Sequence, residues 1–179
     1  MSMDYTYRRI YDPLEHAAIY RRLKEEDLLW CLFSEIEPAE WSEDLYIKLH
    51  NSSGVRETWG GYIDGALAGL AYVQPFCGSL RTRCAEIGLT AFRPYFKQAA
   101  RLARGGLMEI IKHHGETIQS FIGRVPAPNR HILAMLGSLG FTKQCKIPQL
   151  FWFTKLHKHV DGFLVTAKPQ DIKATWEVE

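Results

Sequence analysis

Four basic residues near the middle of the chain have the spacing of one helical face. Arg93, Lys97, Arg101 and Arg104 are separated by four, four and three residues, which brings side chains together on one side of an α-helix. They lie where a helix is expected to begin, and the dipole of a helix makes its N-terminus an unfavourable place for cations. The pattern therefore predicts an anion-binding site at this helix start, with an ordinary solvated polar face as the alternative.

The segment that contains these four residues is basic, although the chain as a whole is not. Residues 81–104 hold six Arg and Lys residues and a single Glu, whereas the 179-residue chain has a formal net charge of only +2. Hydrophobic residues make up 46% and charged residues 23% of the chain, which is typical of a globular protein. We therefore expect a single domain over residues 1–179, in which anion binding depends on local clustering.

Local signals predict the elements that position these residues in the first half of the chain. Asp12-Pro13-Leu14-Glu15 combines an N-cap, a proline at the first helical position and a Glu three residues after the cap, and predicts a helix over 13–25. Two further helical stretches are expected within residues 25–36 and 39–51. Asp64-Gly65 stands between two apolar runs and predicts a β-hairpin with a type I′ turn.

Strands and helices alternate in the second half. The pattern predicts strands at 82–92, 117–125 and 149–156, a helix at about 95–114 that Gly115 ends, and a helix from Asn129 to a stop at Gly140. Residues 157–179 give a less readable tail. Because strand–helix–strand order implies parallel pairing and a hairpin implies antiparallel pairing, we expect a mixed sheet with helices on its faces.

Cysteine and histidine spacing gives little support for a disulfide framework or a metal site. The four cysteines (Cys31, Cys77, Cys84 and Cys145) form no C-x-x-C pair. The pairs His113-His114 and His157-x-His159 have no Cys or carboxylate partner nearby in the sequence, so we predict no metal site. The chain also has no apolar run of about 20 residues and no apolar signal region at its start. We expect a cytoplasmic protein with reduced cysteines.

The segment NRHILAMLGSLGF, residues 129–141, resembles a motif of the GNAT superfamily of N-acetyltransferases. In that superfamily an Asn precedes a helix that ends in Leu-Gly-Phe, and the matching positions here are Asn129, Ala134, Leu139, Gly140 and Phe141. The order and spacing of elements are similar over residues 5–156. The resemblance implies an α+β fold of three layers, with helices on both faces of a mixed, mostly antiparallel sheet of six to seven strands. The chain resembles a divergent member of the superfamily. Phage and prophage genomes carry divergent proteins of this kind, and the chain could resemble those.

The resemblance also implies a binding site for acetyl-coenzyme A. Superfamily members cradle its pyrophosphate in a loop of the form Q/R-x-x-G-x-G/A, which falls here on YFKQAA, residues 95–100. Ala100 matches, whereas Tyr95 and Gln98 replace the Gln or Arg and the first Gly, and the Gln98 side chain could crowd the phosphates. The implied contact residues are Leu89, Ala91, Arg93, Lys97, Gln98, Ala99, Ala100, Arg101 and Asn129. Asn129 could equally serve only as a helix cap.

Acetyl transfer to an amine needs a base for the ammonium and an acid for the leaving thiolate. The superfamily often places a carboxylate on the strand before the pyrophosphate loop, and Glu86 has that position here; a structural salt bridge to Arg81 or Arg83 is the alternative. The usual acid is a Tyr four residues before the motif's glycine, where this chain has Leu136. Tyr95, close in sequence to the expected cofactor, is the candidate hydroxyl.

Three functions remain open at this point. The first is an N-acyltransferase that moves an acetyl group from acetyl-coenzyme A to an unidentified amine. The second is a catalytically inactive protein of the same fold that serves as an interaction or phage assembly component, with a homodimer or an assembly partner as the alternatives for its interaction; the altered loop and missing Tyr favour it. Nucleic-acid binding through residues 81–104 ranks last because no known binding motif accompanies the basic patch. We expect no membrane partner.

Overall fold

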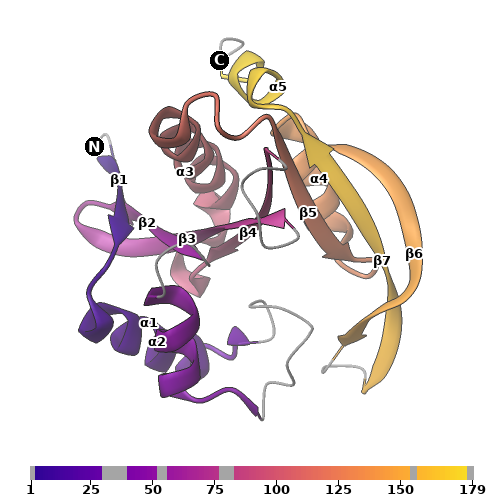
Figure 1. The fold of residues 1–179 in the computed structure, drawn as a ribbon. Helices are drawn as coiled ribbons and strands as arrows, with labels where there is room; N and C mark the ends of the chain where they lie inside the picture. The colour runs from indigo at the N-terminus through magenta and orange to yellow at the C-terminus, as the bar shows by residue number, and fades with distance from the viewer. Residues whose placement is uncertain (1–2, 30–39, 52–55, 77–82, 154–156, 177–179) are drawn as a thin grey trace.

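A seven-stranded sheet with the order β1-β2-β3-β4-β5-β7-β6 forms the centre of the molecule (Figure 1). The computed structural model describes residues 3–29, 40–51, 56–76, 83–153 and 157–176. The strands are β1 (Tyr5–Ile10), β2 (Glu57–Ile63), β3 (Ala66–Pro75), β4 (Cys84–Ala91), β5 (Ser120–Pro126), β6 (Thr142–Phe153) and β7 (Lys158–Ala167). The helices are α1 (Pro13–Glu25), α2 (Glu43–Asn51), α3 (Ala99–His114), α4 (Arg130–Ser138), α5 (Pro169–Ala174) and the short 3₁₀ helix η5 (Arg93–Gln98).

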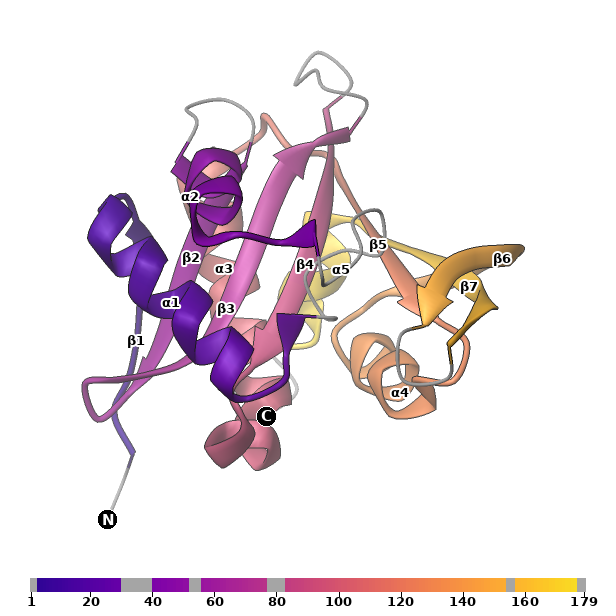
Figure 2. The same cartoon turned by 90° about the horizontal axis from the view of Figure 1, so that it is seen from below.

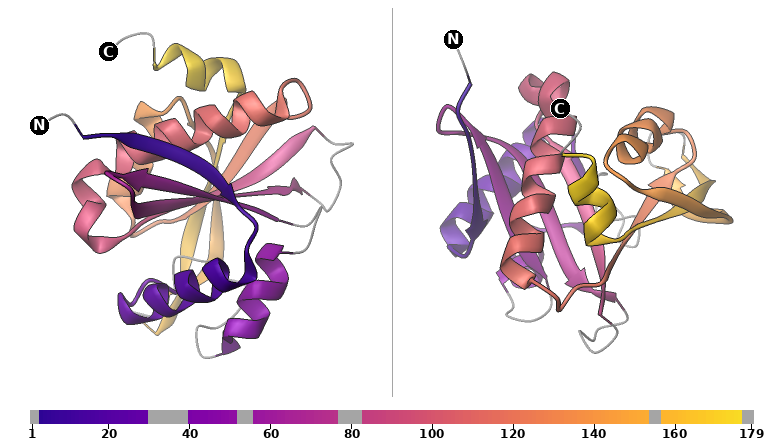
Figure 3. Two further views of the ribbon diagram at one scale, coloured as in Figure 1. Left: turned by 90° about the vertical axis from the view of Figure 1, so that its left-hand side faces the viewer. Right: turned by 90° about the horizontal axis from the view of Figure 1, so that it is seen from above.

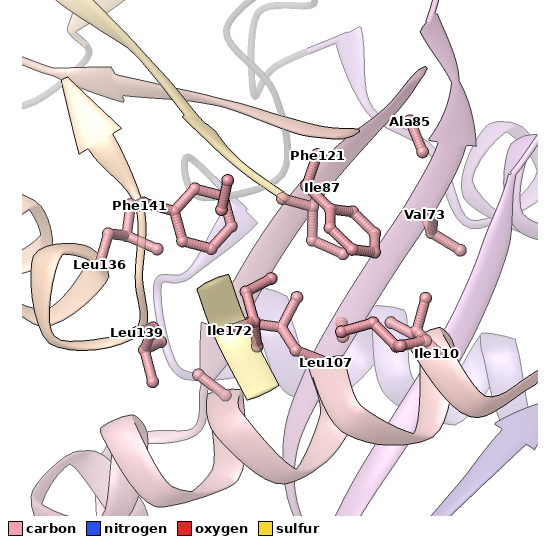
Figure 4. Packing of buried hydrophobic residues seen from close by; sticks show 14 of the residues in the cluster. Val73, Ala85, Ile87, Leu107, Ile110, Phe121, Leu136, Leu139, Phe141 and Ile172 are labelled. Carbon is pink, nitrogen blue, oxygen red and sulfur yellow. The ribbon is translucent and has the colours of Figure 1, made fainter. Parts of the chain in front are cut away.

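Helices cover both faces of the sheet, as the sequence predicts. Helices α1 and α2 lie on one face, and α3 and α5 lie on the other (Figure 3). The larger core lies under α3, where Leu107 and Ile110 point toward Phe121 and Ile87 of the sheet (Figure 4). Leu107, Ile110 and Phe121 are completely buried, and each such side chain contributes about 1.5–3 kcal/mol of burial free energy. None of the described helices is long and apolar enough to cross a membrane.

The strongest local signals give the elements that they predict. The Asp12 side chain accepts a hydrogen bond from the Leu14 N–H at 2.9 Å, and α1 begins at Pro13 and ends at Glu25. Asp64 and Gly65 both have positive φ, at 50° and 81°, so the turn between β2 and β3 is of type I′. Residues 43–51 form α2. Most of the other expected helical stretch, at 25–36, lies outside the described residues.

The structure adds to the second half and corrects one prediction about it. Most of the less readable tail belongs to the sheet, because β7 pairs with both β5 and β6, and α5 follows it. Strands β5 and β6 therefore have no direct parallel pairing, since β7 lies between them and runs antiparallel to each. The parallel pairing that does occur joins β4 to β5, and the other five pairings among the described strands are antiparallel. The sheet is mixed and mostly antiparallel, as predicted.

Candidate functional site

Strands β4 and β5 pair only briefly and then diverge. Residues 84–86 of β4 pair with residues 120–122 of β5, after which β4 continues along β3 and β5 continues along β7. Figure 2 shows β6, β7 and α4 set to one side of β1–β4, with β5 between the two groups. Within the described pairing, residues 87–91 of β4 have no strand along the edge that faces β5. Their backbone groups on that edge are therefore available to a ligand.

A cavity of about 700 Å³ opens where these strands diverge. Its walls come from β4, the end of β5, the first turns of α3, the length of α4 and the aromatic end of β6, with further residues from β1, β2 and β3. Most of the lining is apolar, and the charged side chains on the described wall are Glu86, Lys97 and Arg124. Thr90 also lines this wall. Its hydroxyl oxygen is buried and has no hydrogen-bond partner among the described residues. The cavity thus suits a long ligand with polar groups at intervals.

One end of the cavity meets the N-terminus of α3. Ala99, Ala100 and Ala103 line it with small side chains, and Lys97 lies just before them. The N-cap residue, Gln98, makes no side-chain hydrogen bond to the helix, so no side chain caps the first-turn N–H groups there. The Ala99 N–H already donates to the Phe96 carbonyl of η5, so an anion at this end would meet the N–H groups that follow, the small side chains and the Lys97 ammonium. Helix N-termini of this kind bind phosphate and similar anions. The predicted anion site therefore has a physical basis at this end.

The four-residue basic stripe is not a single helical face. The helix α3 begins at Ala99, four residues later than predicted, because the preceding segment is the 3₁₀ helix η5 with a non-helical Tyr95. The Arg93 Nε donates to the Glu26 carbonyl at 2.6 Å. The Arg101 guanidinium lies over the Tyr5 ring, with 4.2 Å between its Cζ and the ring centroid. Of the stripe, Lys97 is the residue that lines the cavity.

The other predicted contact residues divide between the cavity and the protein interior. Leu89, Ala91, Ala99, Ala100 and Asn129 line the cavity. Gln98 is not on the wall and its Oε1 is buried, so the side chain that the sequence suggested would crowd a pyrophosphate points elsewhere. Asn129 precedes α4 without a capping hydrogen bond from its side chain. Asn129 therefore holds the N-cap position that the sequence predicts, but its side-chain amide makes no capping hydrogen bond, and the residue lines the cavity.

Glu86 lies on the cavity wall with both carboxylate oxygens hydrogen-bonded. The Arg124 Nε donates to Oε1 at 2.6 Å, and the Gln74 Nε2 donates to Oε2 at 2.9 Å. The salt bridge considered from the sequence was to Arg81 or Arg83; the cationic partner is Arg124, and Arg81 lies outside the described residues. The register explains this, because Glu86 pairs with Ile122 and Arg124, two residues on, points to the same face. The Arg124 Nη2 also contacts Oε1, whereas Oε2 accepts only the Gln74 hydrogen bond among the described residues, so Oε2 keeps a lone pair for a ligand proton.

A chain of hydrogen bonds links Glu86 to helix α2. The Arg56 Nε donates to the Gln74 Oε1 at 3.0 Å, and the Arg56 Nη1 lies 3.2 Å from the His50 Nε2. Because a guanidinium only donates, Nε2 of His50 must accept, and its Nδ1 carries the proton that Thr58 Oγ1 accepts at 2.8 Å. These contacts orient the Gln74 amide so that its NH₂ faces Glu86.

Acid is expected to destabilise the fold through this buried histidine. Burial, the Arg56 guanidinium and His16 lower the pKa of His50 from 6.5 to about 2. As the pH falls, the unfolded chain takes up the proton first, so the stabilisation is complete above pH 6.5 and is lost progressively below it. The free energy of unfolding should fall by about 1.4 kcal/mol per pH unit between pH 6 and 5 for this residue. Burial also lowers the pKa of His16, which adds to the slope.

Urea unfolding of the wild type and of His50→Gln at pH 7.5, 6 and 5 measures this contribution. The variant should be less stable at pH 7.5 and show a shallower loss below pH 6.5, because Gln does not titrate. Equal slopes in the two proteins would show that His50 does not remain neutral in the folded state.

Neither position considered for the general acid places an acid on the cavity wall. Leu136 is buried on its wall and offers no proton. Tyr95 is not among the lining residues and packs instead against the core under α1 and α2. The sequence reasoning also missed Arg124, Gln74 and the aromatic residues Phe151, Trp152 and Phe153 of the wall. The alternation of β5 places Arg124 on one face with Ile122, but only the strand order shows that Glu86 is its neighbour.

The fold is that of known N-acetyltransferases. A variant of the spermidine N-acetyltransferase SpeG of Vibrio cholerae aligns over 94% of this chain and 95% of its own, with a TM-score of 0.74 and 14% identity. RimL, a ribosomal-protein α-N-acetyltransferase in complex with coenzyme A, aligns over 92% and 93%, with a TM-score of 0.72 and 17% identity. The ribosomal-protein-S18-alanine N-acetyltransferase of Escherichia coli aligns over 92% of this chain and 94% of its own, with a TM-score of 0.67 and 15% identity. No protein-family model and no curated protein matches by sequence.

Proposed function

We propose that this protein transfers an acyl group, acetyl in the simplest case, from acetyl-coenzyme A to an amine. The observation that carries the proposal is the cavity between β4 and β5, with a helix N-terminus at one end and Glu86 on its wall. The three solved structures cited above, which share this fold, are all N-acetyltransferases. The acceptor class follows from them only in general terms, as a molecule with a primary amine.

The residues of the cavity fit acetyl-coenzyme A in three places. The first-turn N–H groups of α3 and the Lys97 ammonium suit its pyrophosphate. The open edge of β4 at residues 87–91 suits the amides of its pantetheine arm, since an extended chain can pair with an unpaired strand edge. The unpartnered Thr90 hydroxyl and the Asn129 amide are further hydrogen-bonding groups on the wall. Acetyl-coenzyme A supplies the activated thioester.

Glu86 is the residue of this wall that can accept a proton. An amine attacks a thioester only as the free base, so the ammonium form must lose a proton first. The Oε2 atom of Glu86 can receive it, directly or through one water molecule, while Arg124 and Gln74 fix the orientation of the carboxylate. Leu136 leaves the thiolate side without a protein acid at that position, and water there protonates the leaving group.

Lys97 and Arg93 are expected to differ in their effect on cofactor affinity. The sequence suggested that both hold the cofactor, but Lys97 lines the cavity whereas Arg93 binds Glu26. The change Lys97→Ala should weaken acetyl-coenzyme A binding about tenfold, the size of one charge-assisted hydrogen bond at an exposed position. The matched change Arg93→Ala should leave the affinity unaltered.

Calorimetric titration of the wild type and the two variants with acetyl-coenzyme A, with ADP for comparison and at two salt concentrations, tests this. If the two variants lose affinity equally, the pyrophosphate does not lie at the α3 N-terminus. If the wild type binds no acetyl-coenzyme A at all, the transferase proposal fails and the interaction role becomes the better interpretation.

A further inference from the structure

The C-terminal end of α3 brings two histidines to a carboxylate at the start of β2. His113 and His114 end the helix, and Glu57 begins the strand. One ligand atom from each of the three residues lies within 4.8 Å of the others. The closest pair, His114 Nε2 and Glu57 Oε2, are 3.0 Å apart. From the sequence, the histidine pair alone predicted no metal site, because Glu57 lies far from it along the chain.

Neighbouring side chains hold the three groups in place. The Arg9 guanidinium binds Glu57 Oε1 at 3.0 Å, which leaves Oε2 directed to His114. The His113 ring lies edge-on to Trp59, with 5.3 Å between the ring centroids, and 5.0 Å from the ring of His114. His113 is exposed to solvent, whereas Glu57 and His114 are partly buried. The cluster is therefore oriented from the inside and reachable from the outside.

We propose that Glu57, His113 and His114 bind a divalent transition-metal ion such as Zn²⁺. Two imidazoles and one carboxylate form a donor set that Zn²⁺ favours, with a water molecule able to complete a tetrahedral shell. Mg²⁺ and Ca²⁺ prefer all-oxygen shells and do not suit it. The C-terminus of a helix carries partial negative charge, which favours a cation at this end of α3. A bound ion would join α3 to β2.

This site is separate from the proposed acetyl-transfer site. None of its three residues lines the cavity between β4 and β5. A simple ion pair between Glu57 and His114 would account for their contact without a metal, but it would give His113 no part. The role of His113 therefore distinguishes a metal site from an ion pair.

The chain offers a matched control for His113. His159 is also exposed and also lies edge-on to a tryptophan, Trp152, with 5.2 Å between the ring centroids. It is not part of the three-residue cluster found among the described residues. A variant at His159 therefore removes one exposed imidazole beside a tryptophan and leaves the proposed ligands intact.

The experiment is a titration of untagged, metal-stripped protein with ZnCl₂ in a calorimeter, followed by thermal unfolding with and without the ion. The wild type should bind one equivalent of Zn²⁺ and unfold at a higher temperature when the ion is bound. MgCl₂ should show no saturable binding and should leave the unfolding temperature unchanged. His113→Ala and Glu57→Gln should each weaken Zn²⁺ binding at least about tenfold and remove the thermal shift, whereas His159→Ala should match the wild type. His113 is exposed, so its variant should keep the wild-type circular dichroism spectrum.

The absence of saturable binding by the wild type would overturn the proposal. Binding that persists in His113→Ala, or that His159→Ala weakens as much, would also overturn it and leave Glu57 and His114 as an ion pair.

Discussion

Replacement of Glu86 by Gln is expected to lower the turnover number for acetyl transfer about a hundredfold or more, with little change in the affinity for acetyl-coenzyme A. A positioned general base typically contributes about 10²- to 10⁴-fold to a rate, and an amide cannot accept the proton of an ammonium. Glu86 is nearly buried on the cavity wall, away from the α3 N-terminus that we assign to the pyrophosphate. The measurement is steady-state kinetics with an amine acceptor found by screening, beside calorimetric titration of the cofactor.

The design needs a variant that separates chemistry from structure, because Gln at this position would set its NH₂ group against a donor of Arg124 or Gln74. Glu86→Asp keeps the charge and shortens the side chain, so it should keep part of the activity. Full activity in Glu86→Gln would remove Glu86 from catalysis and leave deprotonation to solvent.

The elements that the sequence predicted correctly are those whose start or turn is determined within one short segment. Asp12-Pro13 set the first residue of α1, and Asp64-Gly65 set a turn with two positive φ values. The strand β7 was missed because its place depends on two distant partners, β5 and β6, rather than on a local turn. Long-range pairing of this kind leaves little trace in the order of residues along one strand.

The candidate site shows the same division. The sequence placed Glu86 on the strand before the expected pyrophosphate loop, but its partners come from the neighbouring strands and follow only from the pairing register. The basic stripe failed because four-residue spacing has meaning only within a continuous α-helix, and the segment around Pro94 is a 3₁₀ helix with a break at Tyr95. Charge spacing therefore predicted the helix end that meets the cavity, but not which basic residue of the stripe reaches it.

The largest effect on stability is expected at Gly140, the glycine of the Leu-Gly-Phe motif. Its φ is +86°, and an added Cβ would lie 2.8 Å from the Asp171 backbone oxygen in α5. Gly140→Ala must therefore strain the backbone and push α5 away, although Ile172 of that helix is completely buried in the main core. We expect a loss of about 3 kcal/mol or more, which corresponds to a fall of roughly 6–12 °C in Tm.

Gly137, three residues earlier in α4, is the matched control because an added Cβ there meets nothing within 4 Å. Gly137→Ala should stabilise the protein by up to about 1 kcal/mol, since alanine favours a helix. Thermal and urea unfolding of both variants measures the contrast, and a Gly140→Ala protein as stable as Gly137→Ala would show that α5 does not pack on this turn. Packing against α5 is enough to require a glycine at position 140, so this glycine is a signal of the fold. Evidence for catalysis must come from Glu86.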